Sequence, residues 1–131
     1  MFELSRVRSR LAPGSMTPAH ARRYVASHCK RVPADALDVV LLLTTELVTN
    51  AMWHGAGDAW LDIQVERDLV KVGVTDGGSG EVRIARDFRW PEGGHGLRIV
   101  DALSDRWGVE PMTGTLGKRV WFELSWTAPD Q

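Results

Sequence analysis

Residues 46–54 read ELVTNAMWH and close a long apolar run that begins near Leu37. Glu46, Asn50 and His54 recur at intervals of four residues, so on an α-helix their side chains project from neighbouring points of one face. Burying such a charge or amide without a partner costs on the order of 1–3 kcal/mol. The stretch therefore predicts a helix whose polar side chains have a specific role.

Two interpretations of Glu46 and Asn50 are open at this point. In the first, they form the solvent-facing stripe of an amphipathic helix. In the second, they line a pocket, because apolar side chains occupy almost every side of this helix. A carboxylate in a pocket can act as a general base or orient a water, and an amide oxygen is a hard ligand suited to Mg²⁺. Periodicity alone does not choose between the two.

Size and composition indicate one domain spanning residues 1–131. The apolar fraction of 44% and the charged fraction of 25% are those of an ordinary globular protein. A net charge of −1 gives no general basic field that would attract nucleic acid or an anionic membrane. The single cysteine excludes an intrachain disulfide and a cysteine-based zinc cage, and no apolar run could span a bilayer. We therefore expect a cytoplasmic protein without direct nucleic-acid or membrane partners.

Hydrophobic periodicity and turn residues predict three helices and five strands. Thr17-Pro18 is a favourable helix start, and Arg67-Asp68 reads as a tight hairpin turn. The helices are expected over residues 18–29, 33–53 and 96–104, and the strands over residues 2–11, 59–66, 69–75, 105–112 and 118–126. This order favours an α+β two-layer sandwich, in which a mostly antiparallel mixed sheet carries its helices on one face.

Two glycine-rich stretches add further candidate sites. Residues 76–80 (DGGSG) follow a strand, and the Asp76 carboxylate can accept a hydrogen bond from an exocyclic amine such as that of adenine. Residues 93–97 (GGHGL) enter a helix, where free N–H groups and the helix dipole favour an anion. An ordinary turn and a flexible loop end fit the same residues. Neither stretch matches the P-loop or the dinucleotide-binding pattern.

Taken together, these patches resemble the ATPase superfamily shared by DNA gyrase, the ninety-kilodalton heat-shock chaperones, sensor histidine kinases and mismatch-repair ATPases. The closest likeness is to the small bacterial anti-sigma-factor serine kinases, and it extends from Leu11 to about Trp126. The likeness is carried by an E-x-x-x-N box (Glu46 to Asn50, then His54-Gly55), a D-x-G-x-G box (Asp76 to Gly80), a G-x-G-L box (Gly94 to Leu97) and a late G-K-x-V-W-F-x-L strand (Gly117 to Leu124). The resemblance implies a single histidine-kinase-like domain with the Bergerat-type ATP-binding fold.

The resemblance also implies a role for each matching residue. Asn50 would hold the Mg²⁺ that bridges the phosphates of ATP, and Glu46 would be the catalytic base or water-orienting carboxylate. Asp76 would bind the adenine amine. The other box residues would complete the nucleotide site, with Gly78 and Gly80 shaping the base pocket and Gly94, His95, Gly96 and Leu97 meeting the phosphates.

The implied function is that of a regulatory serine/threonine kinase. Such a protein transfers the γ-phosphate of ATP to a serine of an antagonist protein, sequesters a partner such as a sigma factor, and thereby regulates transcription; a homodimer is also implied. The segment where the family keeps its lid over ATP, residues 81–93, is short in this sequence. That departure favours an alternative, a non-catalytic nucleotide-sensing module that binds proteins. A third hypothesis keeps the fold and treats the pocket as vestigial.

Overall fold

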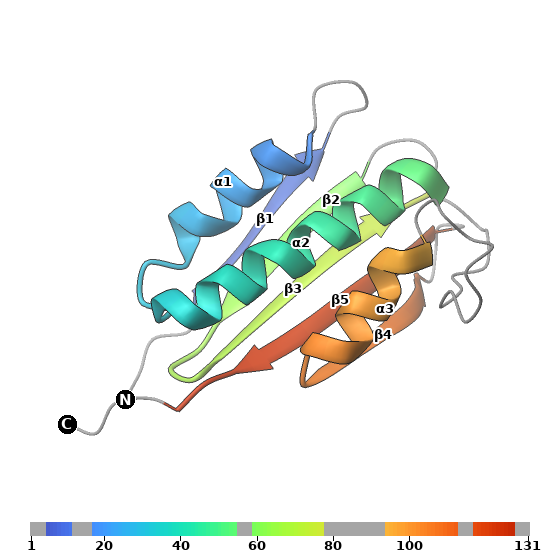
Figure 1. Ribbon diagram of the computed structural model, residues 1–131. Coiled ribbons are helices and arrows are strands. Elements are labelled where there is room, and N and C mark those ends of the chain that lie inside the picture. The colour runs from blue at the N-terminus through green and yellow to red at the C-terminus, as the bar shows by residue number, and fades with distance from the viewer. Residues whose placement is uncertain (1–4, 12–16, 55–58, 78–93, 113–116, 128–131) are drawn as a thin grey trace.

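The computed structural model has its helices on one face of an antiparallel sheet (Figure 1). It describes residues 5–11, 17–54, 59–77, 94–112 and 117–127. In chain order the elements are β1 (Ser5–Leu11), α1 (Pro18–His28), α2 (Ala34–His54), β2 (Ala59–Val65), β3 (Leu69–Asp76), α3 (Gly94–Leu103), β4 (Arg106–Met112) and β5 (Gly117–Ser125). The predicted α+β two-layer architecture is confirmed.

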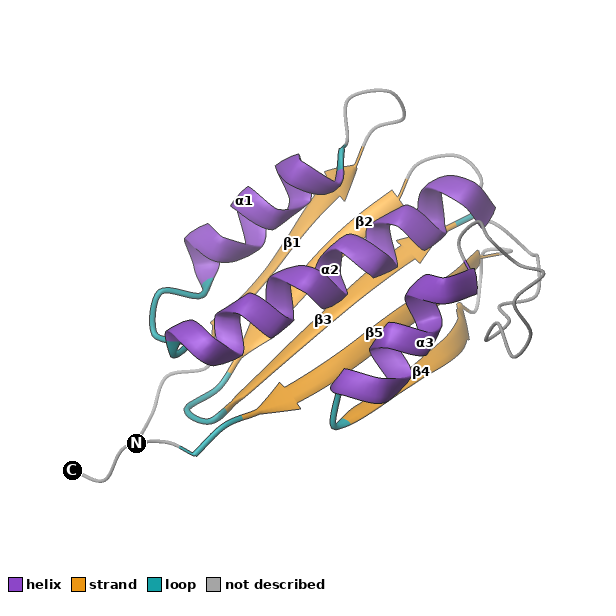
Figure 2. Ribbon diagram, viewed as in Figure 1, coloured by secondary structure: helices purple, strands orange, loops and turns teal. Residues whose placement is uncertain are grey.

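The strand order in the sheet is β1-β2-β3-β5-β4, and each neighbouring pair is antiparallel. The last strand in the chain therefore lies between β3 and the edge strand β4, as Figure 2 shows. This arrangement pairs the end of β3 with the start of β5, two segments that are far apart in the sequence. In the resulting register Asp76 lies opposite Lys118.

The hydrophobic core lies between the helices and the sheet. Alternate residues of the three central strands are buried, and Phe122 of β5 is the largest fully buried side chain among the described residues. The strand residues of this layer are Leu61, Ile63, Val65, Val70, Val72, Val74, Val120, Phe122 and Leu124. The period of two that predicted these strands thus reflects a sheet with one face covered by helices.

The helix α1 begins as the sequence predicts. The Thr17 hydroxyl accepts a hydrogen bond from the backbone N–H of His20 at 3.1 Å, and Pro18 is the first helical residue. Thr17→Ala removes this cap and should lower the free energy of unfolding by about 1 kcal/mol, measured by urea denaturation. Thr17→Ser keeps the capping oxygen and should stay close to the wild type. Equal stability of the alanine variant and the wild type would contradict the capping role.

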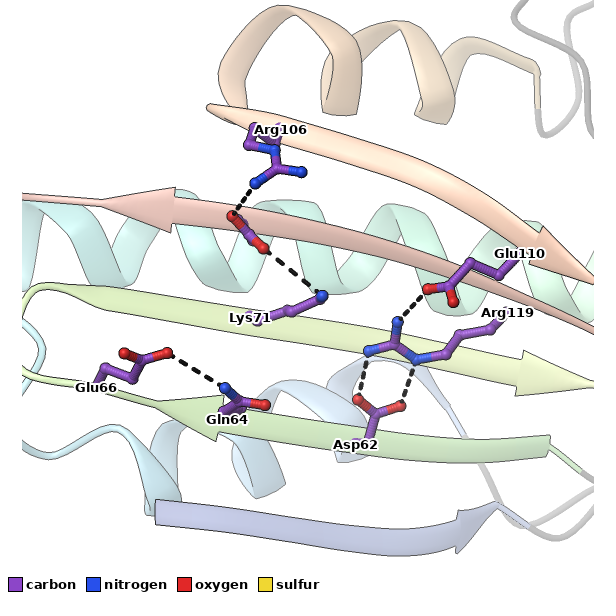
Figure 3. A network of polar contacts seen from close by, with 8 residues as sticks. Asp62, Gln64, Glu66, Lys71, Arg106, Glu110 and Arg119 are labelled. Atoms are coloured by element: carbon purple, nitrogen blue, oxygen red, sulfur yellow. Dashed lines mark hydrogen bonds and ion pairs between the residues drawn. The ribbon is translucent and has the colours of Figure 1, made fainter. Parts of the chain in front are cut away.

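The face of the sheet opposite the helices carries cross-strand ion pairs (Figure 3). Arg119 binds Asp62 through two hydrogen bonds, of 3.1 Å from Nε and 2.7 Å from Nη2, and Glu110 through Nη1 at 3.0 Å. A Cβ at Gly73 would lie 2.5 Å from the Arg119 guanidinium, so a larger residue there would require the end of the Arg119 side chain to shift. These contacts link β2, β3, β5 and β4 across that face, where Lys71 also lies over the ring of Trp121.

Candidate functional site

The polar residues of α2 differ in their burial. Asn50 is 3% exposed and therefore faces the interior, with Leu47 and Val48 buried on the preceding turn. Glu46 is half-buried. The solvent-stripe interpretation is therefore wrong for Asn50, and the pocket-lining interpretation stays a prediction. A buried amide needs a polar partner, because leaving it without one costs free energy, and an amide oxygen is a hard ligand of the kind that Mg²⁺ accepts.

The burial of Glu46 changes its acid strength. Loss of water around the carboxylate raises the pKa of Glu46 above its ordinary value of 4.5, because burial disfavours the charged form. A general base works best when its pKa lies near the working pH, so the shift is in the useful direction. The position of Glu46, one helical turn before Asn50, places it on the same side of α2 as the buried amide.

The raised pKa of Glu46 makes stability depend on pH. Between the ordinary pKa of 4.5, which holds in the unfolded chain, and the raised pKa of the folded chain, the folded state binds more of the Glu46 proton than the unfolded state does. The free energy of unfolding therefore falls as the pH rises through this interval. Glu46→Gln removes this titration. The variant should gain stability relative to the wild type between pH 3.5 and neutral pH, measured by urea denaturation at each pH. A constant difference across that range would contradict the shift.

A buried ion pair closes the end of the sheet. Asp76 is the last residue of β3, and Lys118 is the second residue of β5. Lys118 Nζ lies 3.1 Å from Asp76 Oδ1, and the two side chains are 7% and 3% exposed. Both share the helix-covered side of the sheet with the buried residues Val74 and Val120. The pair thus places two charged groups in a layer whose strand residues are otherwise apolar.

Two details of this pair differ from the sequence prediction. Asp76 continues the strand, although the sequence places it in a glycine-rich loop after residue 75; its backbone pairs with β5 and extends the ladder by one residue. Sequence reasoning missed Lys118 altogether. The pairing of strands could have identified it. The late strand that begins with Gly117 pairs antiparallel with residues 69–76, and this register places Lys118 beside Asp76.

The helix α3 begins at Gly94, two residues before the predicted start, so the G-x-G-L box forms its first turn. Helix ends are the least certain part of a sequence prediction, and first-turn N–H groups lack helical partners. The side chain of Leu97 is fully buried in the core. Any contact of Leu97 with a nucleotide would therefore come from its backbone N–H and not from its side chain.

These elements meet at one end of the molecule. In Figure 1 the end of α2, the end of β3, the start of β5 and the start of α3 lie together, and α2 packs on α3, β3 and β5. Asn50, Asp76, Lys118 and the first turn of α3 are thereby brought to one region. The predicted base-pocket glycines Gly78 and Gly80 and the lid segment 81–93 lie outside the described residues. The side chains of His54 and His95 are not described either.

The described ranges hold no group of three or more His, Cys, Asp or Glu residues that could bind a metal. The amide oxygen of the buried Asn50 would suit a divalent ion as one protein ligand, together with oxygens of bound phosphates and water. Mg²⁺ is commonly held in this way, by one or two protein oxygens plus substrate phosphates. The Asn50 oxygen is thus compatible with a metal ion whose other ligands are phosphate oxygens of the nucleotide and water.

The fold and this polar end define an α+β sandwich of the ATP-binding type. The chain belongs to the histidine kinase-like ATPase domain family, whose match covers residues 13–124. This result confirms the superfamily inferred from the boxes at residues 46–50, 76–80 and 94–97, and it supports an ATP-binding regulatory function. A search of curated proteins found no match. In the described part of the chain, no helix is both long and apolar enough to cross a membrane.

Proposed function

We propose that this chain is a Mg²⁺- and ATP-dependent regulatory kinase of the anti-sigma type. It would transfer the ATP γ-phosphate to a serine of an antagonist protein and would sequester a partner such as a sigma factor in the cytoplasm, as a monomer or a homodimer. The observation that carries the proposal is the burial of Asn50 near the end of α2 and of Asp76 at the end of β3, two element ends that lie together in Figure 1. Membership of the histidine kinase-like ATPase family supports it.

In this proposal each part of the nucleotide has a place. Asp76 accepts a hydrogen bond from the adenine amine, and Gly78 and Gly80 shape the base pocket. The N–H groups of residues 94–97, in the first turn of α3, meet the phosphates, which the positive end of the helix dipole favours. Asn50 holds Mg²⁺, which would neutralise charge on the transferred phosphoryl group.

The half-buried carboxylate of Glu46 is the proposed base. It orients the hydroxyl of the acceptor serine and takes its proton, while the serine oxygen forms a bond to the γ-phosphorus. The bond from that phosphorus to the bridging oxygen breaks, and ADP leaves with the electron pair. The raised pKa of Glu46 favours this proton transfer.

Glu46→Ala should keep ATP binding and lower transfer by about 100-fold or more, because a positioned general base contributes on that scale. The test incubates the protein with γ-labelled ATP and candidate antagonist proteins and measures labelled serine. Asp38→Ala is a matched control, since Asp38 is an exposed acid on the same helix. Wild-type transfer by the Glu46 variant would contradict the assignment of the base.

The same assay separates the kinase from the alternative, a nucleotide-sensing module that binds its partner without transfer. The short segment between the glycine boxes, residues 81–93, favours this alternative, because the family lid lies there. Labelled serine supports the kinase, and ATP that is bound but stays intact supports the sensor. A pull-down from the native host with and without ATP would identify the protein partner in either case.

A further inference from the structure

We propose that Lys118 is a purine-recognition residue, which donates a hydrogen bond from Nζ to the ring nitrogen beside the exocyclic amine of adenine. The inference rests on the proposed function, because it needs a purine nucleotide next to Asp76. It adds a specificity-determining residue to that site. The observations that carry it are the burial of Lys118, its single acceptor in the described residues, and its distance from Asp76.

The first observation is the burial of the ammonium group. Lysine is almost never buried unless it is paired, and Lys118 keeps only 7% of its side chain exposed. The hydrogen bond of 3.1 Å to Asp76 Oδ1 uses one of the three N–H groups of an ammonium ion. Val74 and Val120, the next residues along the same face, offer no side-chain acceptor. Within the described residues, two N–H groups of Lys118 are thus left for a ligand.

The second observation is the order of donor and acceptor. Asp76 presents a carboxylate acceptor, and 3.1 Å from it Lys118 presents a charged donor. Adenine has the complementary order, because its exocyclic amine donates while the neighbouring ring nitrogens, N1 and N7, accept. A base whose amine meets Asp76 therefore brings one of these ring nitrogens toward Lys118. With the phosphates held in the same place, guanine would turn its carbonyl oxygen toward the carboxylate.

A purely structural role for Lys118 makes a different prediction. If its charge only neutralised Asp76, removing it would weaken every nucleotide to a similar extent. A hydrogen bond to a ring nitrogen instead links one atom of the ligand to one atom of the protein. Deleting either atom should then have the same effect, and deleting both should add little further loss.

The test measures the affinity of wild-type protein for ATP, 1-deaza-ATP and 7-deaza-ATP, each with Mg²⁺, by calorimetry. One of the two analogues should bind with an affinity lower than that of ATP by roughly tenfold or more, because it lacks a hydrogen bond to a charged group. Lys118→Met should bind ATP as weakly as the wild type binds that analogue, and should bind the two within about twofold of each other. Lys71→Met is the control, because Lys71 lies on β3, on the opposite face of the sheet, and should keep the wild-type pattern.

The outcomes separate this inference from the function on which it rests. Equal binding of ATP and both analogues by the wild type overturns the role of Lys118 and leaves ATP binding intact. An equal loss for all three nucleotides in Lys118→Met also overturns it, in favour of charge neutralisation. Absence of ATP binding by the wild type overturns the proposed function itself. The analogue comparison on the wild type decides the question even if the Lys118 variant does not fold.

Discussion

Asn50→Ala is expected to weaken Mg-ATP binding on the order of 100-fold and to remove the dependence of the remaining affinity on Mg²⁺. The reason is the position of the amide, which is 3% exposed near the end of α2 and supplies the proposed protein oxygen for the metal. Titration calorimetry with ATP, in the presence of Mg²⁺ and of a chelator, measures both quantities.

Thr49→Ala is the matched control for this variant. Thr49 is the neighbour of Asn50 on α2 and is half-buried, and no part of the proposed site uses it. The control should bind Mg-ATP as the wild type does. Unchanged affinity and unchanged Mg²⁺ dependence in the Asn50 variant would refute the metal assignment, whereas Glu46 and Asp76 would keep their proposed roles.

Asp76→Leu should lower the free energy of unfolding by about 3–5 kcal/mol, because it leaves the ammonium of Lys118 buried without its partner. This is a large part of the total stability of a single domain, which is roughly 5–15 kcal/mol. Urea denaturation measures it without any nucleotide. The double variant Asp76→Leu with Lys118→Met should recover much of the loss, since an apolar pair has no uncompensated charge.

A surface ion pair provides the comparison. Arg106 Nη1 lies 3.7 Å from Glu123 Oε1, and its side chain is 72% exposed. Arg106→Met should therefore change the free energy of unfolding by at most about 1 kcal/mol, as exposed pairs do. If Asp76→Leu were no more costly than Arg106→Met, or if the double variant were as unstable as the sum of the single ones, Asp76 and Lys118 would not form the buried pair described here.

Much of the fold could be predicted from the sequence because its pattern is local. Alternation at Leu61, Ile63 and Val65 predicts a strand with one covered face, and Thr17-Pro18 predicts the start of a helix. The boundaries were less certain, as the early start of α3 at Gly94 shows. Glycine is a poor helix former, so its propensity argues against placing Gly94 in the helix. The N–H groups of a first turn have no partners within the helix, so the hydrogen-bond pattern does not mark the start sharply either.

The site was only partly predictable, for a physical reason. Asn50 and Asp76 were found from motifs, and the burial of both was then established by the packing of α2 on the sheet. Lys118 depends on the register between β3 and β5, which are 42 residues apart at the point where Asp76 meets Lys118. No local pattern fixes such a register; it follows from burial of Val72, Val74, Val120 and Phe122 on one face.

We expect a nucleotide with Mg²⁺ to bind at the end of the sheet where Asp76 and Asn50 lie. A crystal structure of the chain with Mg²⁺ and a non-hydrolysable ATP analogue tests it directly. The expected structure has the adenine amine on Asp76, the metal on the Asn50 oxygen and the phosphates at the first turn of α3. A nucleotide bound elsewhere, or a metal without contact to Asn50, would contradict it.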